Sequence, residues 1–495
     1  MKAIFTTFFL CLSCWALNAQ TTLFNKTYNL TNEWEFMSGL VEEDSSYFFI
    51  NRNIGYTYEA NRLLFGEINK EGELLWSKDL ICVDSSLCTT GRPGLIKEDT
   101  GNFLTYGEYR VHPDSLADAF IYRFDQNGDS ISFYRIGGEG TQGFLDMKKH
   151  PEGGYIACGG NMALDPAGDI YIVRLNENLE VIWEQVILQE GFQVAYKIDF
   201  TEEGGYFIVG KGAVYLGAAQ IIALKLDNIG NLEWYNILGG EGNNDGRHNG
   251  KVLSDGNFLV AASKRNTSDT DFDSYLIKLN IEGTIIWEKV YNAGTRTLFN
   301  TNIIELEDGS IVVGGSKTVF GVRYSRIAKF TDEGELIWEQ RYHGRLPTDS
   351  YFYNIFKTQD GFLAMGNAYS SDESTLKDGW IVKMDSEGQS CDDNPDCLLV
   401  NIAEVEASGK AQLTVSPNPA NDQALLYYYL PKVLSNCSIE VYDLNGRLVF
   451  SESHQQASQE YGVQLDVSAW PSGMYVVQLR SEKGVLLASS LLVRG

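Results

Sequence analysis

Residues 279–287, LNIEGTIIW, contain the pattern that decides the fold: an apolar residue, Asp or Asn, two residues, Gly, three residues and Trp. Full copies of this turn-and-Trp pattern occur at 68–76, 226–234 and 330–338, the last with Thr331 in the Asp position. Two degenerate copies lie at 124–132, with Ser132 in the Trp position, and at 175–183, with Leu179 in the Gly position. A seventh copy begins at Met384 and stops after Gly388, before any Trp.

A second pattern, a turn followed by an aromatic residue or Ile and an apolar run, keeps the same period. It begins at Tyr47, Phe103, Tyr155, Tyr206, Phe258, Ile311 and Phe362. Neighbouring copies are 51 to 56 residues apart. Because two independent patterns share one period seven times, the sequence predicts a repeat architecture.

Each period contains about four short strands, for example 251–253, 258–262, 275–279 and 284–291, with hairpin turn residues between them. Four antiparallel strands repeated seven times predict an all-β, seven-bladed β-propeller. The last repeat lacks its fourth strand, whereas residues 23–28 align with 286–291. We therefore expect the N-terminal strand to complete the last blade and to close the ring, which removes an exposed sheet edge.

The turn-and-Trp pattern resembles the repeat of quinoprotein-type propellers, whose blades also carry Asp, Gly and a Trp four residues later. Many quinone-binding members of that family have eight blades, a vicinal Cys pair and an acidic base beside calcium. This sequence has no vicinal Cys pair. The resemblance therefore implies the scaffold and not the chemistry.

Residues 1–19 begin with Lys2, continue through an apolar stretch and end in Leu17-Asn18-Ala19, which is typical of a secretory signal peptide. The alternatives are a short buried helix and a lipoprotein anchor at Cys14. The chain carries 66 acidic and 39 basic residues, a net charge of −27, which opposes binding to nucleic acids or anionic lipid. No stretch after the signal peptide is long and apolar enough to span a membrane.

Export permits disulfides, because secreted proteins meet an oxidising environment. Cys82 with Cys88, and Cys391 with Cys397, share a spacing of five intervening residues and are predicted to form two local disulfides. Cys158 and Cys437 lie in apolar alternating segments, so we expect two buried free thiols.

The C-terminal segment departs from the repeat period. After residues 20–397, assigned to the propeller, residues 398–411 are interpreted as a linker and 412–495 as a small immunoglobulin-like β-sandwich. This last segment holds four of the ten prolines, alternating strands and the tight Asn445-Gly446 turn. It carries 7 acidic and 5 basic residues, so the acidity belongs mostly to the propeller.

The same segment resembles the type A C-terminal sorting domain of the type IX secretion system of Bacteroidota. The matching positions are Pro417, Asn418, Pro419, Gly446, Gly473 and Tyr475. The resemblance implies export through the periplasm and the outer membrane by the type IX machinery, followed by attachment to a surface lipopolysaccharide or by release. The structural alternative is an ordinary immunoglobulin-like module.

Catalytic motifs do not stand out, and no catalytic residue is assigned. The five histidines are scattered without a metalloprotease motif, and no nucleophile elbow occurs. Residues 125–129, DQNGD, have the spacing of the start of a calcium loop but lack its bidentate Glu and occupy the ordinary repeat turn. We expect no metal or other cofactor, with calcium at this turn as the alternative.

Three consecutive loops between the fourth strand of one blade and the first strand of the next are basic in an otherwise acidic protein. They contain Arg247, His248, Arg296, His343 and Arg345. We interpret these residues as a ligand-binding patch for an anionic group, such as a uronate or a sulfated glycan, against the alternative of unrelated surface charges.

The sequence thus favours a secreted or cell-surface β-propeller that binds glycan or protein ligands without catalysis. One alternative is a polysaccharide lyase or glycoside hydrolase that uses paired carboxylates at the loop face. A second alternative is a structural component of the cell surface.

Overall fold

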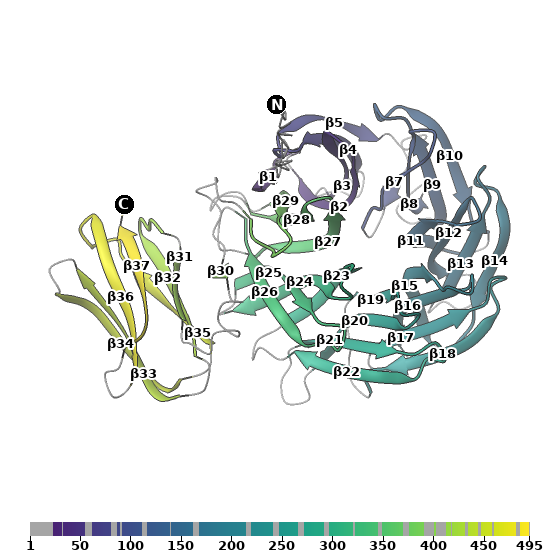
Figure 1. Cartoon of the computed structure of the whole chain (residues 1–495). Helices are drawn as coiled ribbons and strands as arrows, with labels where there is room; N and C mark the ends of the chain where they lie inside the picture. Colours follow the sequence, from purple (N-terminus) through teal and green to yellow (C-terminus); the bar gives the residue numbers. More distant parts are fainter. Residues whose placement is uncertain are drawn as a thin grey trace, which may run out of the picture.

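The computed structural model describes residues 23–31, 33–54, 62–80, 87–89, 92–110, 116–138, 140–161, 168–213, 219–240, 247–265, 272–291, 297–319, 322–344, 349–369, 376–390, 400–401, 412–416, 418–430, 434–443, 447–457, 460–481 and 486–494. All regular structure in this part of the chain is β-strand. Figure 1 shows a ring of sheets around a common axis and a separate group of strands beside it. The predicted signal peptide lies outside the described residues.

The ring contains seven antiparallel sheets in its described residues. The first consists of β2 (Trp34–Glu42), β3 (Ser46–Ile54), β4 (Arg62–Asn69) and β5 (Leu74–Leu80), and the second of β6 (Leu87–Thr89), β7 (Ile96–Lys97), β8 (Phe103–Arg110), β9 (Asp118–Phe124) and β10 (Ser130–Ile136). The third consists of β11 (Gln142–Lys149), β12 (Tyr155–Asn161), β13 (Asp169–Leu175) and β14 (Val181–Ile187), and the fourth of β15 (Phe192–Phe200), β16 (Tyr206–Ala213), β17 (Ala219–Leu226) and β18 (Leu232–Leu238).

The fifth sheet consists of β19 (Asn249–Val252), β20 (Phe258–Arg265), β21 (Phe272–Leu279) and β22 (Ile285–Tyr291). The sixth consists of β23 (Thr297–Glu305), β24 (Ile311–Val319), β25 (Val322–Phe330) and β26 (Leu336–Tyr342), joined at its edge by β30 (Val400–Asn401). Part of the predicted linker therefore forms a short strand, which pairs with Gln340 and Arg341.

The seventh sheet joins the two ends of the ring. It contains β27 (Tyr351–Thr358), β28 (Gly361–Ala368), β29 (Asp378–Met384) and, as its fourth strand, β1 (Phe24–Tyr28). Phe24 lies opposite Lys383 and Tyr28 opposite Gly379 in this antiparallel pairing. The strand exchange expected from the sequence is therefore present, and it satisfies backbone groups that an open edge would leave unpaired.

The first strand of each sheet faces the axis, and the fourth faces outward. First strands of neighbouring sheets contact one another, as β11 does with β15 and β23 with β27. Fourth strands such as β14 and β18 instead leave several of their side chains exposed. Second and third strands are buried on both faces, because each sheet packs between two others.

One contact recurs between consecutive sheets and explains the turn-and-Trp pattern. The turn Gly of one sheet lies against the fourth-strand Trp of the sheet before it. A Cβ added at Gly230, Gly283, Gly334 or Gly388 would lie within 3.0 Å of Trp183, Trp234, Trp287 or Trp338, respectively. Each of these glycines has a positive φ, between 74° and 88°. Gly is therefore required for the turn and for the close approach of the ring.

The same contact continues across the joint between the chain ends. A Cβ at Gly72 of the first sheet would lie 2.7 Å from the Phe24 ring. The Tyr28 hydroxyl donates a hydrogen bond to the Gly72 carbonyl at 2.8 Å, and Lys26 pairs with Glu73 at 2.5 Å. Tyr291 and Lys289 make the equivalent contacts with Gly334 and Glu335. The N-terminal strand thus reproduces the contacts of a regular fourth strand.

Polar side chains hold the turns in shape. Asp125 Oδ1 accepts hydrogen bonds from the backbone N–H groups of Asn127 and Asp129, each at 2.9 Å. Asp227 and Asp385 cap their turns in the same way. This is the Asx-turn role that Asp and Asn commonly take.

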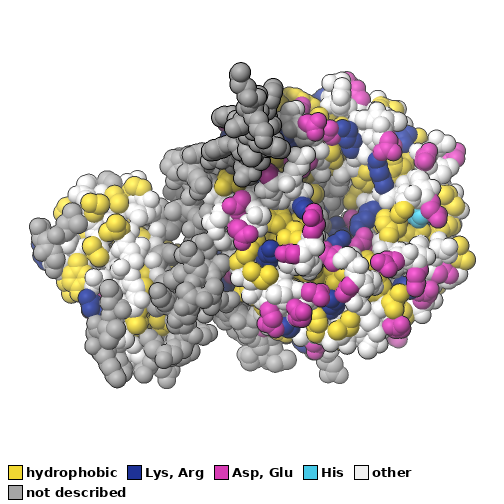
Figure 2. Space-filling view, in the orientation of Figure 1, with side chains coloured by type: hydrophobic (Ala, Val, Ile, Leu, Met, Phe, Trp, Pro, Cys, Tyr) yellow, Lys and Arg dark blue, Asp and Glu magenta, His cyan; other side chains and the backbone are white. Residues whose placement is uncertain are grey.

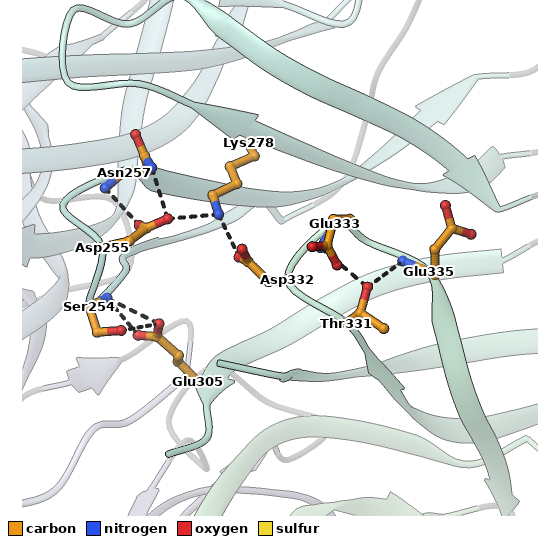
Figure 3. A network of polar contacts seen from close by, with 9 residues as sticks. All are labelled: Ser254, Asp255, Asn257, Lys278, Glu305, Thr331, Asp332, Glu333 and Glu335. Carbon is orange, nitrogen blue, oxygen red and sulfur yellow. Dashed lines mark hydrogen bonds and ion pairs between the residues drawn. The ribbon is translucent and has the colours of Figure 1, made fainter. Parts of the chain in front are cut away.

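A basic residue that was not among the predicted features precedes the last apolar residue of the third strand in six of the seven sheets. The six are Arg123, Arg174, Lys225, Lys278, Lys329 and Lys383. Five of them pair with an acidic residue in the turn between the first two strands of the same sheet. Lys278, which is 4% exposed, joins Asp255 at 2.8 Å and Asp332 of the next sheet at 2.5 Å (Figure 3). These pairs neutralise part of the acidity of the ring.

The C-terminal domain is a sandwich of two antiparallel sheets. One contains β31 (Gln412–Ser416), β32 (Gln423–Tyr429) and β35 (Glu460–Asp466), and the other β33 (Leu434–Asp443), β34 (Leu448–Ala457), β36 (Gly473–Ser481) and β37 (Leu486–Arg494). Alternate residues from both sheets, such as Leu426, Ile439 and Val477, form one apolar core.

Glu35 on β2 ties the joint of the ring together. Its carboxylate accepts hydrogen bonds from the backbone N–H groups of Leu30 at 2.8 Å, Thr31 at 2.6 Å and Gly379 at 3.0 Å. The residue is completely buried. Burial raises the pKa of Glu35 to about 7, although these hydrogen bonds favour the charged form.

The contact between Trp and Gly is open to a matched test within the sixth sheet. Gly334 and Gly309 have φ values of 75° and 78°, but only a Cβ at Gly334 would meet a neighbouring side chain. Ala at either position costs about 1 kcal/mol for the left-handed backbone. We expect Gly334→Ala to lower the free energy of unfolding by about 1–3 kcal/mol more than Gly309→Ala does, because the added methyl group overpacks against Trp287. Equal shifts of the two denaturant midpoints would contradict the contact.

The raised pKa of Glu35 predicts a pH dependence. The folded state binds the proton of the Glu35 carboxyl group more tightly than the unfolded state does. The contribution of this group to the free energy of unfolding is therefore full below about pH 4.5 and is lost as the pH rises to about 7. The loss amounts to about 3 kcal/mol at about 1.4 kcal/mol per pKa unit. Denaturant unfolding of the chain and of Glu35→Gln between pH 4.5 and 7.5 measures it. Parallel pH profiles for the two proteins would show that Glu35 does not titrate in this range.

Candidate functional site

Bulges in four of the first strands place side chains at the axis of the ring. The extra residues are Ser38, Leu145, Tyr196 and Tyr353, where the pairing register skips one position. A β-bulge bends its strand and redirects a side chain, and bulges are common next to binding sites. Leu145 and Tyr196 both line a small cavity at the axis.

Residues 92–95 of the second sheet cross toward the first and seventh sheets. Arg92 Nη1 donates a hydrogen bond to the Tyr353 carbonyl at 2.8 Å, and its guanidinium carbon lies 5.1 Å from the centre of the Tyr353 ring. Ser38 Oγ donates to the Pro93 carbonyl at 2.9 Å. A Cβ at Gly94 would lie 2.2 Å from the Tyr106 hydroxyl, so only Gly allows this path. The crossing fixes Arg92 at the axis.

Arg247 reaches the same cavity from the fifth sheet. Its guanidinium carbon lies 5.4 Å from the centre of the Tyr196 ring, and the buried His248 ring lies 6.3 Å from that centre. The axial cavity has a volume of about 30 Å³, and its lining includes Arg92, Tyr196, Arg247, His248 and Asn354. Five of the seven sheets contribute residues to its wall.

The axial cavity is positive. None of the described residues in its lining is acidic, and the lining residue Lys197 is paired with Asp146 at 3.1 Å. Burial, and then the positive charge of Arg247, lower the pKa of Arg92 to about 9. Burial also lowers the pKa of Arg247. Two partly buried guanidinium groups thus line one cavity, an arrangement that an anion would relieve.

The structure brings together two of the five residues of the predicted ligand-binding patch. Arg247 and His248 line the axial cavity. His343 is 1% exposed and is not part of this lining; its carbonyl accepts a hydrogen bond from Asn25 at 3.0 Å. Burial lowers the pKa of His343, which favours the neutral ring. Arg296 and Arg345 lie outside the described residues.

Arg92 is not among the predicted ligand-binding residues, although the repeat holds a signal for it. Arg92 lies eleven residues before Phe103, and Arg247 lies eleven residues before Phe258. Both arginines therefore occupy the same position in the repeat, in the second and fifth sheets. An alignment of the seven copies on their second strands would have selected the pair.

The predicted metal and disulfide sites have different outcomes. No group of His, Cys, Asp and Glu suited to a metal ion is found among the residues that the structure describes. Cys158 and Cys437 are buried free thiols, as expected. The two predicted disulfides fall outside the described side chains, since Cys82, Cys391 and Cys397 are not described and the side chain of Cys88 is not placed.

A larger groove of about 890 Å³ opens among the turns of the second and third sheets. Its wall includes Glu98, Arg123, His150 and Tyr155. Glu98 is 8% exposed and accepts hydrogen bonds from Arg123 and Tyr155, both at 2.8 Å. Figure 2 shows acidic side chains spread over the visible face of the ring, with basic ones among them. The buried carboxylate of this groove thus serves as an ion-pair partner.

The described residues of the predicted sorting motif connect strands of the sandwich. Asn418 accepts a hydrogen bond from the Val493 backbone at 2.7 Å and donates one to the Leu491 carbonyl at 2.8 Å. The buried Tyr475 donates to the Pro471 carbonyl at 2.7 Å, and Gly473 begins β36 with a φ of 155°. Pro419 is exposed beside Asn418, whereas Pro417 and Gly446 lie outside the described residues.

Comparison with known families identifies the C-terminal segment. Residues 414–493 match the secretion system C-terminal sorting domain family. The chain thus carries a sorting domain of the type IX secretion system, which directs it to the cell surface or the extracellular space and implies an interaction with the type IX machinery. Within the described residues, no helix has the length and hydropathy that a membrane span requires.

Solved structures similar to this chain include PorZ, described as an essential surface component of the type IX secretion system of Porphyromonas gingivalis. It is 12% identical, with 95% of this chain and 70% of that chain covered and a TM-score of 0.30. The β-propeller domain of the Trilobed protease from Pyrococcus furiosus is 8% identical, with 73% and 100% covered and a TM-score of 0.40. Puromycin hydrolase is 10% identical, with 80% and 58% covered and a TM-score of 0.47. A search of the curated proteins finds no matching sequence.

Proposed function

We propose that this protein acts outside the cell as a non-enzymatic binding or adhesion protein whose β-propeller binds acidic glycans at the axial cavity. The observation that carries the proposal is the pair Arg92 and Arg247. These arginines face one cavity whose described lining residues include no acidic side chain, in a chain with a net charge of −27. In an acidic protein a basic cavity marks a place where an anionic group is favoured over the surrounding surface.

The sorting domain supports the location of this activity. Residues 414–493 direct the chain to the compartment in which surface and matrix glycans are met. The groove among the turns favours the binding function over the hydrolase alternative, because Glu98 is held by Arg123 and Tyr155. The carboxylate of Glu98 is thus engaged by side chains of the protein itself.

A binding array of glycans and matrix proteins tests the proposal on the full chain. We expect binding to uronate-bearing glycans, no binding to neutral glycans and no cleavage products. Arg247→Gln should weaken the affinity for acidic glycans at least tenfold. The control is Arg62→Gln, an exposed arginine that pairs with Asp79 on the first sheet. Equal binding to acidic and neutral glycans, binding to matrix proteins alone, or release of shortened glycans would contradict the proposal.

A further inference from the structure

The two sheets of the sorting domain have different surroundings. Tyr427 on β32 is buried and contacts the ring: its hydroxyl accepts a hydrogen bond from Arg341 Nη2 at 3.0 Å, and its ring centre lies 4.8 Å from the Arg341 guanidinium carbon. Figure 1 shows β31, β32 and β35 on the side of the domain toward the ring, with β34 and β36 on the far side. The outer face of the four-stranded sheet, which contains β34, β33, β36 and β37, is therefore turned away from the ring.

Exposed apolar residues gather at one end of this outer face. Leu448 of β34, Met474 of β36 and Leu491 of β37 are each between 47% and 52% exposed, and they are the exposed large hydrophobic residues in the described part of the domain. Leu448 lies opposite Tyr442 in the strand register, and Tyr442 lies opposite Val476. Val476 in turn lies opposite Leu491, so one apolar row crosses all four strands.

A second apolar pair lies beside this row. Met474 is opposite Val493, and it shares a face with Val476 because side chains two residues apart on a strand point the same way. The alternate residues Tyr475 and Val477 belong to the buried core of the sandwich, so Met474 and Val476 point outward. We call the following six residues the outer patch: Tyr442, Leu448, Met474, Val476, Leu491 and Val493.

Polar residues border the outer patch along the strands. The neighbouring row consists of Ser451, Glu440, Gln478 and Ser489. Arg480 Nε pairs with Glu440 at 3.1 Å, which neutralises the carboxylate of this row. Figure 2 shows hydrophobic side chains and few charged ones on the visible surface of the sorting domain. Single exposed apolar residues are ordinary on protein surfaces, whereas a contiguous group with a polar border marks an interaction site.

From these observations we infer that the type IX machinery binds the sorting domain at the outer patch, through a component whose docking surface is apolar and uncharged. Every residue of the patch lies within 414–493, the segment that matches the sorting domain family and implies an interaction with this machinery. The contact of the other sheet with the ring leaves the patch accessible. An anionic membrane surface is disfavoured, because the chain has a net charge of −27. The inference is independent of glycan binding by the ring.

Export of the full chain from a bacterium with a working type IX system tests the inference. The patch variant combines Leu448→Ser with Leu491→Ser. We expect at least a tenfold loss of protein from the medium and the cell surface, with accumulation in the periplasm, because the machinery loses its apolar contact. The matched control combines Ile182→Ser with Ile286→Ser, two equally exposed apolar residues on the fourth strands β14 and β22 of the ring, and should be exported normally.

Two single variants separate the apolar character of the patch from the position itself. Leu491→Lys adds a charge and should block export, whereas Leu491→Met keeps the apolar surface and should be exported normally. Melting curves of the purified proteins show whether each variant is folded. Normal export of the folded patch variant or of folded Leu491→Lys would overturn the inference. An equal loss of export in the ring control or in Leu491→Met would overturn it as well.

Two measurements on the purified full chain examine the other possible occupants of the patch. We expect a monomer in sedimentation; a dimer that dissociates in the patch variant would assign the patch to a second copy of the chain. We expect no binding to vesicles of phosphatidylethanolamine and phosphatidylglycerol; binding that the patch variant loses would assign the patch to a lipid surface. Either assignment would overturn the inference.

Discussion

The ring depends on one contact, the packing of a fourth-strand aromatic residue against the turn glycine of the next sheet. Four strands cannot bury both of their faces alone, so each sheet needs a neighbour at a fixed distance. The contact of Trp234 with Gly283 sets that distance, and the glycines of the fourth, sixth and seventh sheets repeat it, whereas Gly128 of the second sheet lies nearest Lys78 and Phe65. Phe24 and Gly72 continue it where the chain ends meet, so the joint is packed like the other interfaces between sheets.

The two degenerate copies of the pattern fit the same rule. Ser132 occupies the Trp position of the second sheet, and Leu179 occupies the Gly position of the third, so both partners of one contact are changed together. Leu179 keeps the left-handed turn at a φ of 65° and is 3% exposed in the core cluster against which Tyr134 packs. A buried leucine thus occupies the place of the missing indole.

The periodic part of the structure could be predicted from the sequence. Turn chemistry and strand alternation are local, so the repeat, the closing strand and the buried thiols followed from spacing alone. The axial cavity could be predicted only in part, because it depends on bulges that shift side chains by one position and on the crossing of residues 92–95. Arg247 and His248 were selected from their loop, but the partner Arg92 comes from a sheet 155 residues earlier in the chain. The ion pairs of Lys278 were missed for a similar reason, since Asp332 belongs to the next sheet.

A double-mutant cycle at Ser132 and Leu179, between the second and third sheets, tests the role of this contact most directly. We expect Ser132→Trp alone to lower the free energy of unfolding, because Trp and Leu179 compete for one space, and Leu179→Gly alone to lower it through lost burial. The double variant restores the ordinary Trp and Gly pair, so it should recover about 1–3 kcal/mol relative to the sum of the single losses. Strictly additive losses would show that the aromatic residue and the turn glycine act independently, and would contradict the account.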